Sequence, residues 1–314
     1  MFPSLGNISY INYALTASVG GYLVVFQGMD VGALASFLQY SRTFAQPLAQ
    51  MSQQTNVLLA AMAGAERIFA ILKEESEVDE GTVTLDQTDP KQWYWVKGEE
   101  RIPVVGNIQL NEVDFGYVPD VPILKKINVW AEPGLKVAFV GATGAGKTTI
   151  TNLINRFYEI NNGEITFDTI PVTDIKKDDL RKTISIVLQD THLFTGSIAD
   201  NIRYGNLDAT DDEVVKAAKL ANAHGFIKRL PHGYQTEITG DGEGLSQGQR
   251  QLLAIARAAV ANPKVLILDE ATSSIDSHTE ALISKGMDQL MEGRTSFVIA
   301  HRLSTIRNAD VIMV

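Results

Sequence analysis

The feature that most constrains the fold is a glycine-rich loop, Gly-Ala-Thr-Gly-Ala-Gly-Lys-Thr at residues 141–148. It follows an apolar run at 136–140, typical of a buried parallel strand, and precedes 149–157, which is typical of a helix. In this context backbone N–H groups can turn around phosphates, and the helix N-terminus adds a favourable dipole. Lys147 is expected to reach the β- and γ-phosphates, and Thr148 to bind Mg²⁺. The residues expected to hold a nucleotide here are Gly141, Thr143, Gly144, Ala145, Gly146, Lys147, Thr148 and Thr149.

Two further apolar runs end in polar residues. Residues 264–268 lead into Asp269 and Glu270, and residues 295–300 lead into His301. Ligands of open α/β sheets bind beyond the carboxyl ends of the strands, so these side chains and the loop are expected to meet at one site. Asp269 fits a carboxylate that helps to hold Mg²⁺, and Glu270 is placed to polarise an attacking water. The pattern predicts an α/β phosphate-loop NTPase domain.

A segment between these runs carries a resemblance to a known family. Leu-Ser-Gln-Gly-Gln-Arg at 245–250, followed by a helical stretch at 251–259, is similar to the LSGGQ signature of the ATP-binding-cassette (ABC) ATPases. That signature separates the family from other phosphate-loop NTPases. Gln247 stands where the pattern has its first glycine, while Ser246 and Gly248 are kept. Ser246 can still donate a hydrogen bond, and the helix can still point its N-terminus at a phosphate.

Further matches follow in the order of the ABC family. Tyr117 resembles the aromatic residue that stacks on adenine, and Gln189 resembles the Q-loop glutamine, which lies near Mg²⁺ and couples ATP to the membrane domain. Residues 239–244 resemble the X-loop of exporters, residues 273–276 the D-loop, and His301 the switch histidine that contacts the γ-phosphate.

The resemblance implies that two nucleotide domains pair head to tail. Each ATP then lies between the phosphate loop of one domain and the signature of the other. Catalytic roles are implied for Glu270, His301, Gln189 and Lys147, and Mg²⁺ binding for Thr148, Gln189 and Asp269. Beside the phosphate loop, ATP contacts are implied for Tyr117, Ser246, Gly248, Gln249 and Asp276.

Charge is distributed unevenly along the chain, which suggests two environments. The charged side chains of residues 1–72 are Asp30, Arg42, Glu66 and Arg67. The uncharged run at 8–26 reaches the length of about 20 residues that a membrane-spanning helix needs. A buried core helix or a signal-peptide core is the alternative.

A second long segment, 31–72, mixes large apolar residues with glutamines. Polar residues in a spanning helix usually face a bundle interior or a water-filled cavity. Pro47 could kink this helix, and Glu66 and Arg67 would lie beyond the membrane. A long soluble amphipathic helix is an equally good interpretation of this segment alone.

These patterns predict three regions. Residues 1–73 are expected to be the C-terminal part of a transmembrane domain with two helices, residues 74–106 a charged, irregular linker, and residues 107–314 an ABC nucleotide-binding domain. Within the linker, residues 93–95 (Trp-Tyr-Trp) are expected to pack on the next domain. Residues 1–72 resemble the last two of the six spans of an exporter half-transporter, and the chain stops inside an expected strand, so a fragment truncated at both ends is expected.

The resemblance implies ATP hydrolysis coupled to export of an amphipathic drug, lipid or peptide. The expected protein is a multi-pass cell-membrane protein with its nucleotide domain in the cytoplasm, ATP and Mg²⁺ as cofactors, and a second half-transporter as homo- or heterodimeric partner. Membrane lipid and a small amphipathic cargo are further expected partners.

Other functions remain open at this point. A soluble ABC ATPase would share the ATP motifs without a membrane helix, and a non-transporting fragment would do nothing alone. An importer fits less well, because importers usually carry the ATPase on a separate chain. The net charge of −10 argues against nucleic-acid binding through a basic surface. The chain has 0 cysteines, which excludes disulfides and a cysteine nucleophile.

Overall fold

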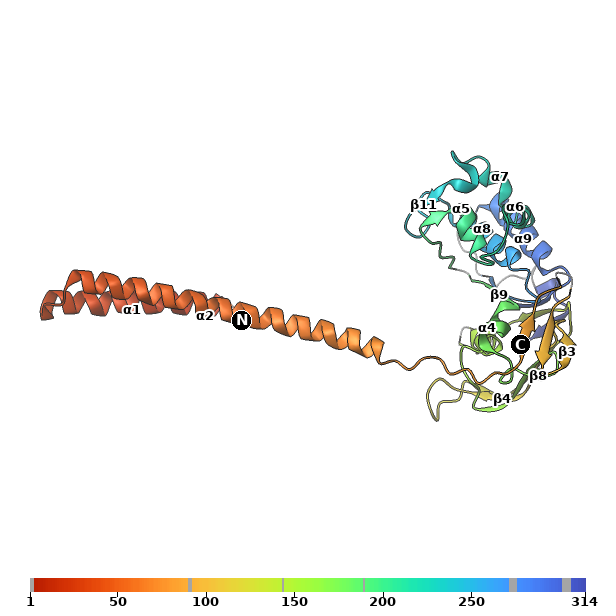
Figure 1. The fold of residues 1–314 in the computed structure, drawn as a ribbon, viewed down its shortest axis with the longest axis horizontal. Helices are drawn as coiled ribbons and strands as arrows, with labels where there is room; N and C mark the ends of the chain where they lie inside the picture. Colours follow the sequence, from red (N-terminus) through yellow and green to blue (C-terminus); the bar gives the residue numbers. More distant parts are fainter. Residues whose placement is uncertain (1–2, 90–91, 143, 189, 271–275, 301–305) are drawn as a thin grey trace. The chain divides into compact units, whose positions relative to one another are not determined.

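The chain folds into two compact units, Met1–Val78 and Asp79–Val314. The computed structural model describes residues 3–314 except 90–91, 143, 189, 271–275 and 301–305, and it describes only the backbone of residues 3–9, 45–46, 48–49, 52–53, 270 and 300. The first unit holds helices α1 and α2, and the second holds the remaining helices and strands (Figure 1).

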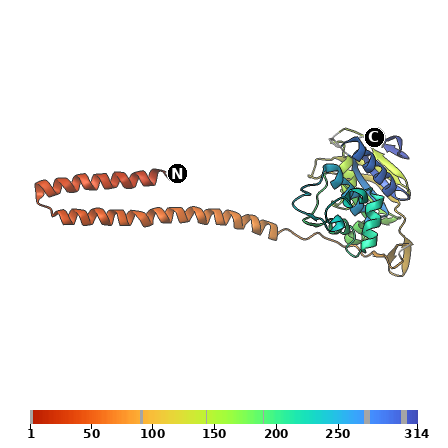
Figure 2. The ribbon, with the colours of Figure 1, turned by 90° about the horizontal axis from the view of Figure 1, so that it is seen from above.

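The first unit is a hairpin of two helices, α1 (Pro3–Gln27) and α2 (Val31–Leu72), which lie side by side (Figure 2). Helix α2 begins after Asp30, whose carboxylate accepts a hydrogen bond from the first turn at 3.0 Å. Gly20 lies against Leu34, and a Cβ at Gly20 would stand 2.1 Å from Leu34 Cδ1. The small residue therefore allows close contact between the two helices.

Length and composition select one stretch of this unit as able to cross a membrane. Among the residues with described side chains, that stretch is Gln54–Leu72. The first span predicted from the sequence, 8–26, extends into residues of which only the backbone is described. Helix α2 continues through Pro47. The two predicted helices are therefore present, while their passage through a membrane stays a prediction.

The second unit is organised around a five-stranded parallel sheet in the order β14-β6-β13-β12-β9. Its strands are β6 (Lys136–Phe139), β9 (Ile184–Val187), β12 (Val265–Glu270), β13 (Thr295–Ala300) and β14 (Val311–Met313). The three apolar runs that precede the predicted site residues all become neighbouring strands of this sheet. Asp269 and Glu270 lie within β12, where the sequence places them just after it.

A four-stranded antiparallel sheet, in the order β5-β4-β7-β8, packs against one part of this sheet. Its strands are β4 (Ile108–Phe115), β5 (Leu124–Ala131), β7 (Asn162–Phe167) and β8 (Ile170–Pro171). Alternate residues of β4, including Ile108 and Leu110, are buried together with Phe139 and Phe297 of the parallel sheet. Helix α3 (Lys147–Ile154) adds Leu153 to this core, which we call the nucleotide core.

A second core forms around helix α8 (Gln247–Val260) and helix α9 (Ser277–Met291). It includes Leu252, Ile255 and Leu290, and it reaches the parallel sheet through Leu268. The shorter elements in the second unit are α4 (Lys177–Lys182), α5 (Ile198–Arg203), α6 (Asp211–Leu220), α7 (His224–Ile227), the 3₁₀ helix Gly233–Gln235, β10 (Gly196–Ser197) and β11 (Glu237–Ile238). We call this second cluster the helical core.

The region predicted as an irregular linker, 74–106, contains a small antiparallel sheet instead. Its strands are β1 (Thr84–Asp86), β2 (Tyr94–Lys97) and β3 (Glu100–Pro103), in that order. Trp95 is fully buried and its indole N–H donates to a carboxylate oxygen of Asp168 at 3.0 Å, while Trp93 is also buried. The predicted packing of the aromatic run on the domain is thus confirmed. Strands of three or four residues rich in charge give no alternation from which a sheet could be predicted.

Candidate functional site

The glycine-rich loop joins β6 to the first turn of α3, as its sequence predicts. Gly144 and Gly146 have φ angles of 86° and 88°, a left-handed conformation that favours glycine. Gly146 occupies the N-cap of α3 and makes no side-chain cap, so backbone N–H groups of the first turn remain available to an anion. A Cβ at Gly146 would stand 2.7 Å from Leu124 Cδ2, which gives the same position a second need for glycine. Thr143 lies outside the described residues.

Lys147 folds back over this loop. Its ammonium donates to the carbonyl oxygens of Gly141 at 2.8 Å and Ala142 at 2.9 Å. These contacts hold a positive charge next to the concave backbone that would receive phosphates. Thr148, the next residue, has an exposed side chain in the first turn of the same helix. An ammonium donor and a hydroxyl group therefore lie at one helix end, and their binding of a Mg²⁺–nucleotide stays a prediction.

Tyr117 lies beside this helix and is held by several contacts. Its hydroxyl donates to Thr149 Oγ1 at 3.3 Å and accepts from Asn152 Nδ2 at 3.5 Å. Its ring packs edge to face on Phe115 and Tyr158, with centroid separations of 4.9 Å for each. Tyr117 is 45% exposed, and its stacking on a planar base stays a prediction. Tyr158 and Asn152 were not predicted as site residues. The one signal for Tyr158 is its position directly after a predicted helix.

Register places the acidic end of β12 close to the loop. Phe139, the last residue of β6, is paired with Ile299 of β13, and Ile299 is paired with Asp269. Because neighbouring strands are about 5 Å apart, the backbone at Asp269 lies about 10 Å from the end of β6, on the same edge of the sheet. Glu270 follows at the end of β12, paired with Ala300. The side chain of Glu270, and all of Gln189 and His301, lie outside the described residues.

The predicted signature residues start helix α8 and form its cap. Ser246 Oγ accepts from the backbone N–H of Gln249 at 3.3 Å, and Gln249 Oε1 accepts from the backbone N–H of Ser246 at 2.9 Å. This reciprocal pair is a capping box. It leaves the backbone N–H groups of Gln247 and Gly248 at the helix start, where a phosphate could bind them. Gly248 is buried, and Gln247 is half-buried.

The structure does not bring all the predicted residues to one place within the chain. The phosphate loop and Tyr117 adjoin the nucleotide core, while Ser246 begins a helix of the helical core. Asp276 caps another helix, α9, where its carboxylate accepts from the backbone N–H of Thr279 at 2.9 Å. That N–H lowers the pKa of Asp276 below its usual range. This separation fits a site completed by a second domain.

Comparison with known proteins adds independent findings. Residues 124–273 match the family model described as ABC transporter. The chain is 46% identical over 310 residues to an uncharacterized ABC transporter ATP-binding protein, YfiC, of Bacillus subtilis, a match that covers 99% of this chain and 49% of the relative. It is 44% identical over 313 residues to a fatty acid ABC transporter ATP-binding/permease protein of Mycobacterium bovis, covering 99% of this chain and 47% of the relative.

A third relative is an ATP-dependent lipid A-core flippase of Saccharophagus degradans, 41% identical over 308 residues, with 98% of this chain and 50% of the relative covered. The chain thus spans about half the length of the curated relatives it matches. The matches include the first unit as well as the second, because they cover nearly the whole chain.

Proposed function

This chain belongs to the ABC transporter family, and we therefore propose that it is the ATP-hydrolysing part of an exporter. The observation that carries the proposal is the phosphate loop with Lys147 folded over it, at the same sheet edge as the acidic end of β12. A capped helix with free N–H groups in the helical core supplies the second phosphate-binding element. These are the parts that phosphoryl transfer to water needs: a cradle, a cation site and a group that orients water.

Within one site, Thr148 and Asp269 offer oxygen ligands of the kind that Mg²⁺ prefers, and Gln189 is assigned to the same ion by family resemblance. Among the described residues, no group of three or more His, Cys, Asp or Glu side chains could hold a metal by itself. A cation bound through one carboxylate, a hydroxyl, an amide oxygen and the phosphates agrees with that finding. When bound, the ion would neutralise charge on the phosphates, while Lys147 would bind them and Glu270 would orient the water.

The partner in this proposal is a second half-transporter. In that arrangement Ser246, Gly248 and Gln249 would serve the ATP held by the partner's phosphate loop, while His301 and Glu270 act on the chain's own ATP. The support is the division between the two cores, which puts the loop and the signature helix in different parts of the unit. Homodimer and heterodimer both satisfy it.

The membrane part of the proposal rests on the first unit. Large apolar side chains such as Tyr22, Phe37 and Phe44 are exposed along both helices, as expected for lipid-facing or bundle-facing surfaces. We assign α1 and the first half of α2 to the bilayer. We place the end of α2 outside it because of the charges of Glu66 and Arg67, although Gln54–Leu72 is itself long and apolar enough to cross a membrane. Two relatives are named as a fatty acid transporter and a lipid A-core flippase. Their names favour an exporter with a lipid-like amphipathic cargo over a soluble ABC ATPase.

Glu270→Gln tests the ATPase. The variant is expected to bind ATP and to lose steady-state Mg²⁺-dependent hydrolysis, by about 100-fold or more, because an amide cannot take a proton from water. Glu292→Gln, a change at an exposed glutamate after α9, serves as the matched control. Hydrolysis that persists in Glu270→Gln would overturn the assigned role.

Single cysteines test the membrane placement, since the chain has 0 cysteines of its own. In sealed vesicles, Tyr22→Cys should resist a membrane-impermeant maleimide and react only after detergent is added. Leu207→Cys, at a position 75% exposed in the ATPase unit, is the accessible control. Equal labelling of both cysteines in intact vesicles from the cytoplasmic side would favour a soluble ABC ATPase.

A further inference from the structure

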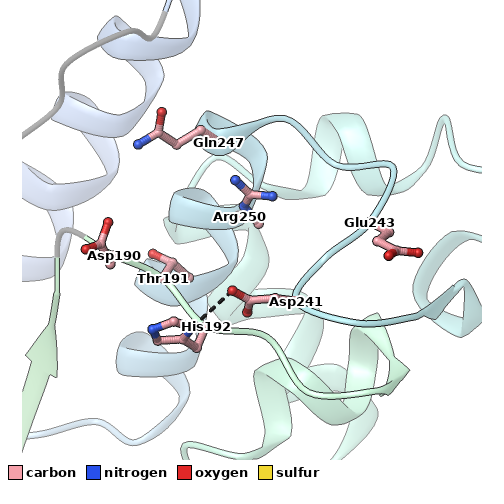
Figure 3. A pocket seen from close by; sticks show the side chains of 7 residues that line it. All are labelled: Asp190, Thr191, His192, Asp241, Glu243, Gln247 and Arg250. Carbon is pink, nitrogen blue, oxygen red and sulfur yellow. Dashed lines mark hydrogen bonds and ion pairs between the residues drawn. The ribbon is translucent and has the colours of Figure 1, made fainter. Parts of the chain in front are cut away.

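A polar pocket of about 430 Å³ lies between the segment after β9, the loop before α8 and the start of α8. Its lining residues are Asp190, Thr191, His192, Asp241, Glu243, Gln247 and Arg250 (Figure 3). Gln189, which the family resemblance places near Mg²⁺, directly precedes Asp190 of this lining. Helix α8 begins within the signature. The pocket is therefore where two parts of the nucleotide machinery meet inside one chain.

One carboxylate joins the two sides of this pocket. Asp241 Oδ1 accepts from the backbone N–H of Leu193 at 2.9 Å, and Asp241 Oδ2 is bound by His192 Nδ1 at 3.0 Å. The N–H of Leu193 and the ring of His192 hold the pKa of Asp241 below its usual range. Leu193 is buried in the helical core, so Asp241 ties its loop to a segment that is itself anchored.

The loop that carries Asp241 fits closely around its neighbours. Gly242 has a φ angle of 87°, and a Cβ there would stand 2.7 Å from Arg250 Cδ and 3.1 Å from Leu193 Cδ1. Gly240 and Gly244 also have positive φ angles, of 55° and 86°. A loop with three such glycines has little conformational preference of its own, so its position depends on the contacts of Asp241 and on this close passage.

We propose that Asp241 is a positioning residue for ATP hydrolysis, which joins the segment after Gln189 to the loop that starts the signature helix. The inference rests on the proposed function, because the proposed function gives the start of α8 a role at the partner's ATP. Asp241 touches neither nucleotide nor water in this role. It acts through Leu193 and His192, so that a change at one nucleotide contact moves the helix that serves the other.

The test compares Asp241→Ala, Asp241→Asn and His192→Ala in the complete transporter in lipid nanodiscs. Asp241→Ala should lower kcat for ATP about fivefold, because it removes both contacts, while the Kd of a fluorescent ATP analogue stays within about twofold. Asp241→Asn should recover much of the loss, since its amide oxygen can still accept from Leu193. His192→Ala should fall between the parent and Asp241→Ala. Asp212→Ala, at an exposed carboxylate on α6, is the matched control.

The outcomes separate the two proposals. If the parent shows no hydrolysis that depends on Glu270, the proposed function fails and this inference fails with it. If the parent hydrolyses ATP and Asp241→Ala keeps its kcat, only the positioning role is overturned. The positioning role is also overturned if the fall in kcat comes with a similar fold-loss of ATP affinity, or with a lower melting temperature, and Asp241→Asn does not recover. A purely structural contact would then explain the result.

Discussion

Asp168→Asn is expected to destabilise the ATPase unit through the buried donors around this carboxylate. Asp168 Oδ2 accepts from the indole N–H of Trp95 and the backbone N–H of Val105, both at 3.0 Å. Asp168 Oδ1 accepts from the backbone N–H groups of Gly106 at 2.9 Å and Asn107 at 2.8 Å. Burial raises the pKa of Asp168, although these donors favour its ionised form. The carboxylate thus ties β2 and the entry to β4 onto the turn between β7 and β8.

The magnitude follows from the pairing of donors. An asparagine presents one acceptor oxygen and one N–H₂ group, so either orientation of its amide leaves two of the four donors without an acceptor. One of those two is always fully buried and the other partly buried. An unsatisfied buried donor costs about 1–3 kcal/mol, and a partly buried one less, which gives a loss of about 2–4 kcal/mol in the free energy of unfolding.

Urea unfolding in detergent, followed by tryptophan fluorescence, measures this loss as a lower midpoint at an unchanged slope. Asp120→Asn is the matched control, because Asp120 also has a left-handed φ, 64° against 50° at Asp168, and lies exposed in a loop. The control should stay within about 0.5 kcal/mol of the parent. If Asp168→Asn unfolds at the same midpoint as Asp120→Asn, the four-donor anchor does not stabilise the unit and the reasoning is refuted.

Three other changes have defined outcomes. Lys147→Met should lower kcat for ATP by about 100-fold or more through loss of a phosphate-binding cation, with no fall in melting temperature, and a circular-dichroism melt beside the ATPase assay checks both. Gly163→Ala should cost about 2–3 kcal/mol in urea unfolding, since its φ is 91° and a Cβ would meet a backbone oxygen of β4 at 2.5 Å, whereas Gly134→Ala, with φ 83° and open space, should cost about 1 kcal/mol. The backbone N–H and the hydroxyl of Thr210 lower the pKa of Glu213. The ionised carboxylate therefore stabilises the folded unit at a pH above the usual glutamate pKa, and this contribution is lost as the pH falls through the folded pKa. The difference in unfolding free energy between the parent and Glu213→Gln should shrink on acidification.

The site could be predicted from the sequence wherever chemistry and strand order coincide. The glycine-rich loop, Asp269 and Glu270 each follow or end an apolar run, and carboxyl ends of parallel strands share one edge. The five-stranded sheet brings the loop and the backbone of Asp269 and Glu270 to one edge, while their roles stay predictions. Tyr158, which supports Tyr117, could not be predicted because its contact depends on the turn after α3 and not on any motif.

The antiparallel parts of the unit could not be predicted in the same way. The strand β4 contains register shifts between Leu110 and Phe115, which break the alternation that marks a half-buried strand. The sheet at 84–103 depends on Trp95 reaching Asp168, a contact between residues 73 positions apart. The charged residues and short strands of this region are also typical of a linker. The contact between Trp95 and Asp168 shows that the region packs on the ATPase unit.

The departure of the signature at Gln247 can be judged from the cap itself. The capping box uses Ser246 and Gln249, and the buried position belongs to Gly248, so the position of Gln247 takes no part in starting the helix. Its side chain lines the same pocket as Asp241 without entering the contacts of that carboxylate (Figure 3). The glutamine therefore leaves both N–H groups of the helix start in place, and Gln247→Gly is expected to change kcat less than Asp241→Ala in the same nanodisc assay. A larger loss in Gln247→Gly would contradict this reasoning.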